Sequence, residues 1–96
     1  MIKSFRDDWL QTFYQTGKNP GPIPASIESA LNRKLDLIDA STSEADLRVP
    51  PGNRFKHLDG KMSHLCAIRV NKQYRLIFEW SDGHAWDIYL DPHTYR

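Results

Sequence analysis

The last ten residues of the chain, DIYLDPHTYR, concentrate side chains that could bind an anion or move protons. Asp91, His93 and Tyr95 alternate along this segment, and Pro92 ends any strand that precedes them. Histidine has an unperturbed pKa of about 6.5, so it can act as a general acid or base near neutral pH, and a carboxylate can orient it. Without other partners the three would be ordinary terminal residues.

Two arginines are candidates to bind an anion beside this tail. A three-residue loop at 71–73 places Arg69 directly opposite Arg75 on adjacent antiparallel strands. Like charges in that position destabilise a sheet by a few tenths to about 1 kcal/mol. Either Asp87 or Glu79 neutralises the pair in a solvated salt-bridge lattice, or the arginines form an anion site, since guanidinium groups bind phosphate oxygens through planar pairs of donors.

An aromatic side chain is expected on the same face. A loop at 81–83 sets a register in which Tyr89 lies opposite Arg75. A tyrosine ring can stack on a base, so two guanidinium groups beside a phenol favour a phosphodiester as the ligand. The segment Arg54-Phe55-Lys56-His57 offers a second set of basic groups.

The elements that position these residues follow from hydrophobic periodicity. Residues 1–5 alternate as in an edge strand, and a short helix is predicted from Asp7 to a C-cap at Gly17. A longer helix begins near Pro24, where a proline costs no hydrogen bond. Its apolar stripe consists of Ile27, Leu31, Leu35 and Ile38.

Three antiparallel strands are predicted in the second half of the chain. Apolar residues alternate in three segments: Cys66, Ile68 and Val70; Tyr74, Leu76, Phe78 and Trp80; Trp86, Ile88 and Leu90. Loops at 71–73 and 81–83 bring all of them to one face, with Gly83 as the left-handed residue of a bulged hairpin. An N-terminal short strand and two helices packed on one face of a small antiparallel sheet make an α+β fold.

Composition limits the remaining possibilities. A chain of 96 residues that is 40% hydrophobic fits a single domain, 1–96. The net charge of +1 excludes a polycation that coats nucleic acid at random. The one cysteine, Cys66, is expected to be an inert core thiol. The sequence contains neither a secretion signal nor an apolar run of roughly 20 residues, so a cytoplasmic protein without membrane contact is expected.

These residues make the chain resemble the HigB toxins, a branch of the RelE superfamily of ribosome-dependent messenger-RNA endonucleases. The resemblance runs from MIKSF through LDLIDAS, DLRVPPGNR, Gly60 and IRVNKQYRLIFEW with SDG to the final DPH. It implies a RelE-like fold and the toxin half of a type II toxin-antitoxin pair. It also implies an endoribonuclease that enters the ribosomal A site, uses no metal or other cofactor, and cuts the message by attack of the ribose 2′-hydroxyl on the adjacent phosphate.

The resemblance also implies partners. The first is a HigA-type helix-turn-helix antitoxin. The toxin would be held at operator DNA only through this antitoxin. The others are the small ribosomal subunit and its mRNA. Two alternative functions stay open: a non-catalytic RNA-binding module of the same fold, and a regulatory domain whose polar face binds an acidic protein.

Residue roles are carried over where the motifs match. Asp91 and His93 match the terminal acidic-X-histidine motif, and Arg75 matches the arginine after the aromatic residue of the strand. His57 lies one position later than the related histidine. The expected catalytic residues are His57, Arg75, Asp91 and His93, with the histidines carrying protons, Asp91 tuning or deprotonating, and Arg75 stabilising the charged transition state.

RNA binding is assigned to basic and aromatic side chains around that centre. The expected RNA-binding residues are Arg54, Lys56, Arg69, Tyr89 and Tyr95. Pro92 stands where many members have a tyrosine. Either Tyr95 replaces that tyrosine or its stacking role is missing.

Overall fold

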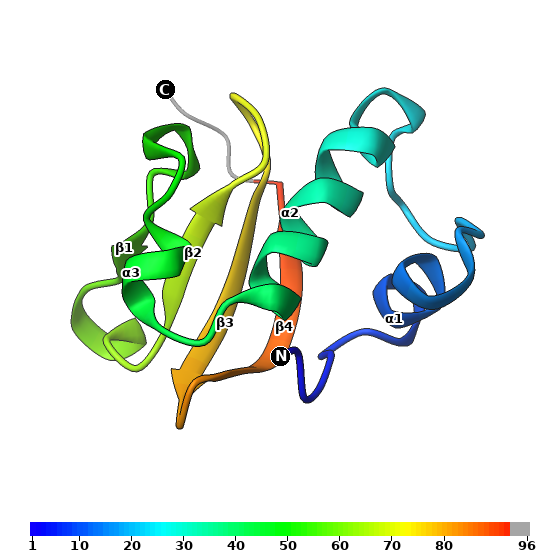
Figure 1. The fold of residues 1–96 in the computed structure, drawn as a ribbon. Coiled ribbons are helices and arrows are strands. Elements are labelled where there is room, and N and C mark those ends of the chain that lie inside the picture. Colours follow the sequence, from blue (N-terminus) through cyan, green and yellow to red (C-terminus); the bar gives the residue numbers. More distant parts are fainter. Residues whose placement is uncertain (93–96) are drawn as a thin grey trace.

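The computed structural model describes residues 1–92 and has helices on one face of a four-stranded antiparallel sheet, so the α+β prediction is confirmed (Figure 1). The strands lie in the order β1-β2-β3-β4, which is also their order along the chain. Helix α2 lies across β3 and β4, and α3 lies over β1 and β2. Within the described residues, no helix is long and apolar enough to cross a membrane.

Both predicted helices are present. α1 spans Asp8–Thr16 and ends at Gly17, whose φ of 80° is left-handed and whose N–H donates to the Phe13 carbonyl at 2.8 Å. A short 3-10 turn, η1 (Ala25–Ile27), leads into α2 (Glu28–Ala40). The four residues of the predicted stripe are all buried, which explains why α2 packs on the sheet with that face: Ile27, Leu31, Leu35 and Ile38.

Short elements connect α2 to the sheet. They are α3 (Glu44–Leu47), η2 (Pro51–Asn53) and η3 (Gly60–Met62). Asn53 is fully buried, and its side-chain amide donates to the carbonyls of Leu47 at 3.1 Å and Val49 at 3.0 Å. Because a buried amide is costly unless it is hydrogen-bonded, Asn53 holds the loop in one conformation.

The first β-hairpin has the predicted register. β2 (Cys66–Arg69) pairs with β3 (Arg75–Ser81) so that Cys66 lies opposite Phe78 and Arg69 lies opposite Arg75. A further strand, β1 (Lys56–His57), pairs with β2 and was not predicted. Two residues are too few to reveal an alternating pattern.

The second hairpin differs from the prediction. β3 and β4 (His84–Asp91) are joined by two residues, Asp82 and Gly83, with φ of 54° and 77°. The prediction of a three-residue loop at 81–83 is therefore wrong, because Ser81 belongs to β3 and pairs with His84. Positive φ at both central positions is the geometry of a type I′ turn, whose twist matches that of the strands and which favours Asp-Gly.

A β-bulge at Asp87 shifts the register once more. Glu79 pairs with Trp86, but Ile77 pairs with Tyr89, so β4 contains one extra residue. Asp87 has φ of 53°, and its backbone N–H donates to the Ser4 hydroxyl at 2.8 Å. The extra residue reverses the alternation, because Ala85 before it and Ile88 after it both belong to the core.

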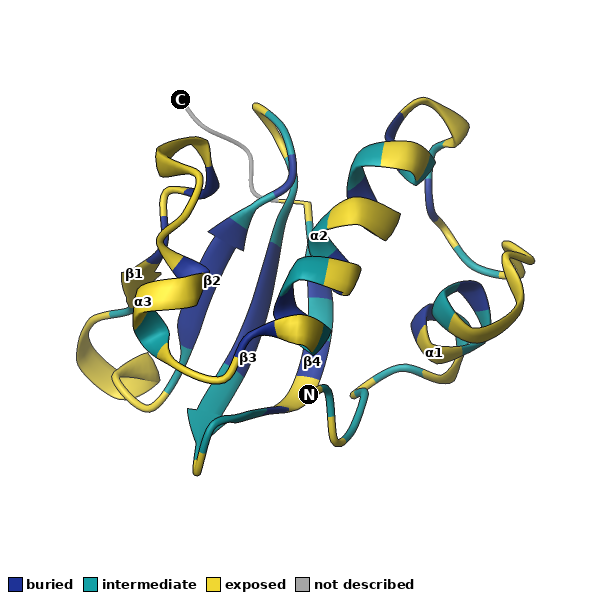
Figure 2. Cartoon of the chain, viewed as in Figure 1, coloured by how far each residue is buried: buried dark blue, intermediate teal, exposed yellow. Residues whose placement is uncertain are grey.

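The two-residue turn and the bulge together overturn two predictions. Trp86 does not lie on the apolar face, since it is 37% exposed. Arg75 does not face Tyr89, because it pairs with Asp91 instead. Figure 2 shows the core, with buried residues concentrated on β2 and β3.

The N-terminal segment, residues 1–5, was predicted as an edge strand; it runs beside β4 but forms isolated bridges instead of a regular strand. Isolated parallel bridges join Ile2 to Ala85 and Phe5 to Ile88. The backbone N–H of Lys3 donates to the Ala85 carbonyl at 2.8 Å, and that of Arg6 donates to the Ile88 carbonyl at 3.0 Å. The segment therefore covers the outer edge of β4, which would otherwise be open to other chains.

Candidate functional site: a basic hollow on the sheet

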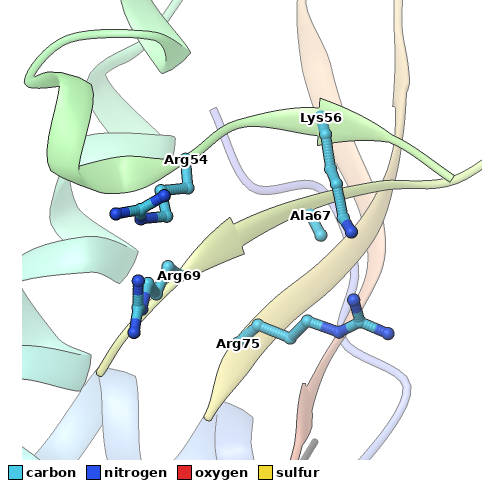
Figure 3. A pocket seen from close by; sticks show the side chains of 5 residues that line it. All are labelled: Arg54, Lys56, Ala67, Arg69 and Arg75. Atoms are coloured by element: carbon cyan, nitrogen blue, oxygen red, sulfur yellow. The ribbon is translucent and has the colours of Figure 1, made fainter. Parts of the chain in front are cut away.

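A hollow of about 480 Å³ lies on the sheet and is lined mainly by cations (Figure 3). Its lining residues, which define the basic hollow, are Arg54, Lys56, Ala67, Arg69 and Arg75. Four of these five carry a positive charge, and no acidic residue of the described chain is among them. Such a concentration of one charge in a concave surface attracts anions.

Strand pairing places the hollow on the face opposite the core. Lys56 pairs with Ala67, and Arg69 pairs with Arg75 two residues along β2. Side chains alternate along a strand, so Ala67 and Arg69 share one face while Cys66, like Ile68, points into the core. The small side chain of Ala67 leaves space between the longer cations.

Arg54 comes from the connection before β1. Its backbone is left-handed, with φ of 47°, and its N–H donates to the Pro51 carbonyl at 3.1 Å. The residue before Arg54, Asn53, is buried and is held by its hydrogen bonds to two loop carbonyls. A turn held in this way directs the Arg54 side chain over β2.

The cations form two groups around Ala67. In Figure 3 the guanidinium groups of Arg54 and Arg69 lie on one side of Ala67, and the charged ends of Lys56 and Arg75 lie on the other. The Nε of Arg69 donates to the Asn71 carbonyl at 2.9 Å, which turns this side chain toward the β2–β3 turn. The hollow can therefore present positive charge at two neighbouring places.

Among residues 1–92, neither Asp87 nor Glu79 forms the salt bridge that was one of the two alternatives for the arginine pair. Arg75 Nε instead lies 3.0 Å from Asp91 Oδ2, with side chains 14% and 30% exposed. Asp87 accepts a hydrogen bond from the Ser4 hydroxyl at 3.1 Å. The bulge thus brings two of the predicted catalytic residues, Arg75 and Asp91, into direct contact.

The other three cations of the hollow lack a carboxylate partner within the described part of the chain. Among residues 1–92, Arg54, Lys56 and Arg69 form no salt bridge. The carbonyl of Asn71, which is bound to Arg69, is a neutral acceptor and leaves that charge uncompensated. An anionic ligand would supply the missing negative charge, which makes anion binding the chemistry that the hollow supports best.

The structure does not bring His57 to the basic hollow. His57 pairs with Cys66 on β2, on the core side of the sheet. Its Nε2 lies 2.5 Å from Glu44 Oε1 in α3, and its ring packs edge-on against Phe55 with centroids 5.3 Å apart. On a two-residue strand the alternation that directs Lys56 to the hollow directs His57 away from it.

Tyr89 lies opposite Ile77, further along the same face of the sheet. The guanidinium carbon of Arg6 sits 3.8 Å from the centre of its ring, and Arg6 also forms a salt bridge with Asp7 at 2.9 Å. A cation over an aromatic face is an attractive contact. No pattern in the sequence indicates Arg6 as a site residue, because its neighbour on β4 lies far away along the chain.

Two predicted site residues, His93 and Tyr95, lie outside the described residues. Asp91, which ends β4, and Pro92 are described. Asp91 is the strand partner of Arg75.

Cys66 takes no part in the chemistry of the hollow. It is 1% exposed and lies in the core, as predicted. Burial, with a smaller contribution from the negative charge of Glu44, raises the pKa of its thiol to about 12. A thiol with this pKa is protonated at neutral pH and is a poor nucleophile.

Comparison with known proteins adds independent information. A family profile described as "RelE-like toxin of type II toxin-antitoxin system HigB" matches residues 3–93. Toxin HigB-1 of Vibrio cholerae serotype O1 is 58% identical over 95 residues, which cover 99% of this chain and 100% of that toxin. An uncharacterized protein of Haemophilus influenzae is 47% identical over 92 residues, which cover 96% of this chain and 91% of that protein.

Proposed function

Because the chain belongs to the HigB-like family of RelE-like toxins, and a type II toxin has an antitoxin as its partner, we propose that it is a ribosome-dependent endoribonuclease. It cleaves messenger RNA in the ribosomal A site and so stops translation in the cytoplasm. Its partner is a HigA-type helix-turn-helix antitoxin. The observation that supports this proposal is the basic hollow, in which three cations without a salt bridge among residues 1–92 accompany the Arg75–Asp91 pair.

In the proposed reaction, the scissile phosphate occupies the part of the hollow between Lys56 and Arg75. The ribose 2′-oxygen attacks the phosphorus and loses its proton to a base, while the bond to the 5′-oxygen breaks and that oxygen takes up a proton. Negative charge develops on the non-bridging oxygens of the phosphorus during the attack. Arg75 stabilises them, since a guanidinium group stays charged and donates along two parallel directions.

Proton transfer is assigned to the end of β4 and the residues after it. Asp91 is held beside Arg75 and is assigned to orient His93 or to deprotonate the 2′-hydroxyl. His93 is assigned to proton transfer because imidazole is the side chain that suits a general acid or base near neutral pH. His57 is left out of the proposed centre because it is bound to Glu44 away from the hollow.

RNA is held by the surrounding side chains. Arg54, Lys56 and Arg69 contact backbone phosphates, in keeping with the sequence-based assignment. Tyr89 can stack a base only on the ring face that Arg6 does not cover. Tyr95 remains the candidate replacement for the tyrosine that Pro92 displaces.

The proposal is tested by substituting Arg75→Ala and following message cleavage in a translating extract. Loss of the transition-state contact should reduce the cleavage rate by about 100-fold or more. Circular dichroism checks that the variant is folded, since Arg75 is largely buried and bonded to Asp91. Lys18→Ala, an exposed residue beyond α1, serves as the matched control and should cleave normally.

The same experiment separates the alternatives. Growth arrest by the wild type without message cleavage would favour a non-catalytic RNA-binding toxin. Wild-type cleavage that Arg75→Ala leaves unchanged would show that the hollow is not the catalytic centre.

A further inference from the structure

A second hollow adjoins the basic hollow and shares two of its arginines. Its volume is about 450 Å³. Its lining residues, which define the flanking hollow, are Lys34, Gly52, Arg54, Arg69, Val70, Asn71 and Lys72. As in the basic hollow, four of the described lining residues are cations and none of them is acidic.

The cations of the flanking hollow come from separate elements. Lys34 belongs to α2, Arg54 follows η2, and Lys72 lies in the turn between β2 and β3. The fold brings these like charges close together, and their mutual repulsion has an energetic cost. That cost is offset when an anion binds among them.

Lys34 is held in place from the buried side. Its ammonium group donates to the side-chain oxygen of Asn53, whose amide nitrogen donates to two backbone carbonyls of the preceding loop. Burial, followed by the nearby charge of Arg33, lowers the pKa of Lys34. This ammonium group uses one of its N–H donors in the bond to Asn53 and is partly desolvated. Its remaining donors make it a strong partner for an anion.

Arg69 stands between the two hollows. Its Nε is bound to the Asn71 carbonyl, so its remaining donors can reach a ligand in either hollow. Arg54 and Arg69 form the group of cations on one side of Ala67, away from Lys56 and Arg75 (Figure 3). Gly52 also lines the flanking hollow, and a Cβ added there would meet nothing within 4 Å.

We propose that the flanking hollow binds a second backbone phosphate of the RNA strand, next to the phosphate between Lys56 and Arg75. This inference rests on the proposed function for the identity of the ligand, but the binding itself requires no cleavage. A single strand carries one charge per nucleotide, so a strand that crosses both hollows meets a separate group of cations at each. Lys34 and Lys72 are thereby assigned to substrate binding.

The test measures binding of a short fluorescent single-stranded RNA, 2′-O-methylated so that it cannot be cleaved, to the full-length protein at several salt concentrations. Lys72→Glu should weaken the affinity about fivefold more than Lys18→Glu does. Both changes alter the net charge by the same amount, and both residues are exposed. The slope of log affinity against log salt should fall in magnitude by about 0.7 for each phosphate that the variant no longer neutralises.

Lys34→Met provides a second variant. It should also weaken RNA binding and reduce the salt slope, and its thermal unfolding is measured in parallel because Asn53 loses a donor. A 2′-O-methylated dinucleotide, which contains a single phosphate, should bind Lys72→Glu and Lys18→Glu equally well.

The inference is overturned if Lys72→Glu binds the longer RNA as Lys18→Glu does, or if it weakens binding of the dinucleotide to the same extent. Failure of the proposed function looks different. In that case the wild type does not cleave message on ribosomes, while the Lys72→Glu defect in RNA binding persists.

Discussion

At the residue scale, Arg75 differs from the other cations of the basic hollow because a carboxylate accompanies it. Its Nε lies 3.0 Å from Asp91 Oδ2, and only 14% of the side chain is exposed. A charge-assisted hydrogen bond of this kind fixes the direction of the guanidinium group. Arg54 and Lys56 have no comparable constraint among the described residues and can adapt to the path of a bound strand.

Asp91→Asn is expected to separate binding from catalysis. The amide keeps the shape of the carboxylate but removes its charge, so the hollow becomes more positive and RNA affinity should be equal to or greater than that of the wild type. Cleavage should fall at least about tenfold, because the proposed proton acceptor is lost. The free energy of unfolding, measured with urea, should decrease by about 1 to 2 kcal/mol.

An outcome in which Asp91→Asn loses RNA affinity together with cleavage would contradict this division of roles. It would mean that Asp91 maintains the shape of the hollow through Arg75. Arg75→Ala, which removes the other half of the pair, supplies the reference for such a structural effect.

Some site residues are predictable from the sequence and others are not, and the difference is physical. Arg69 and Arg75 were placed correctly because the register of the first hairpin follows from unbroken alternation. Asp91 was predicted as catalytic but not as the partner of Arg75, because the bulge that aligns them has no signature in the apolar pattern. His57 was grouped with Lys56 as a basic neighbour, although adjacent residues of a strand face opposite ways.

At the element scale, β4 is organised around its bulge. Asp87 adopts a left-handed conformation, and the Ser4 hydroxyl both accepts from its backbone N–H at 2.8 Å and donates to its carboxylate at 3.1 Å. Two hydrogen bonds to a neighbouring segment thus hold the irregularity in place. The bulge turns Asp91 to the face of the basic hollow while Ile88 and Leu90 remain in the core.

Asp87→Gly and Asp87→Val are expected to differ. Glycine accepts positive φ readily, so Asp87→Gly should lose only what the carboxylate contact with Ser4 contributes, about 0.5 to 1 kcal/mol. Valine is strained at this position and should destabilise the fold by about 2 kcal/mol or more. Urea unfolding of the two variants measures the difference.

Equal stability of the two variants would mean that residue 87 has left the bulge and that the strand pairs in another register. The cleavage assay distinguishes that case, because a shifted register moves Asp91 away from Arg75 and removes activity. Ser4→Ala, which leaves residue 87 itself unchanged, is the matched control for the loss of the two hydrogen bonds.

Elements that repeat a pattern were predictable, and elements that depend on single residues were not. α2 was identified because the stripe residues recur with helical spacing; three of them, Leu31, Leu35 and Ile38, are buried residues of α2, and Ile27 is buried in the 3-10 turn that precedes it. The type I′ turn was assigned one residue too many, since Asp82-Gly83 satisfies both a two-residue and a three-residue loop in sequence. β1 has two residues and exists because β2 offers a free edge.

At the scale of the whole molecule, the sheet divides two tasks between its faces. One face packs on α2 and forms a core around fully buried side chains such as Phe78 and Leu76. The other presents the basic hollow, and the flanking hollow adjoins it with Lys34 of α2 in its lining. Substitutions of exposed cations that line the hollows should therefore change RNA binding with little effect on stability.

Cys66 offers a measurement of the whole fold. Because its pKa is raised from 9.0 to about 12, the thiol is protonated in the native state and should not react with iodoacetamide at about pH 8. In urea, where the core is opened, it should react within minutes. Mass spectrometry of the alkylated chain follows both conditions.

The raised pKa also has a consequence for stability. A group whose pKa is higher in the folded state stabilises the fold below its unfolded pKa of 9.0 and loses that contribution as the pH rises toward 12. Cys66→Ala should make the free energy of unfolding less dependent on pH in this range. Rapid native-state alkylation under mildly alkaline conditions would show that the strand pair β2–β3 opens without global unfolding.

The pairing of the N-terminal segment with β4 matters for synthesis as well as for architecture. Ile2 and Phe5 find their partners, Ala85 and Ile88, only after the intervening chain through β3 has been made. A nascent chain on the ribosome therefore lacks both the closed edge and the carboxylate beside Arg75 until β4 leaves the exit tunnel. Under the proposed function, vectorial synthesis itself would protect each ribosome from the toxin molecule it is producing.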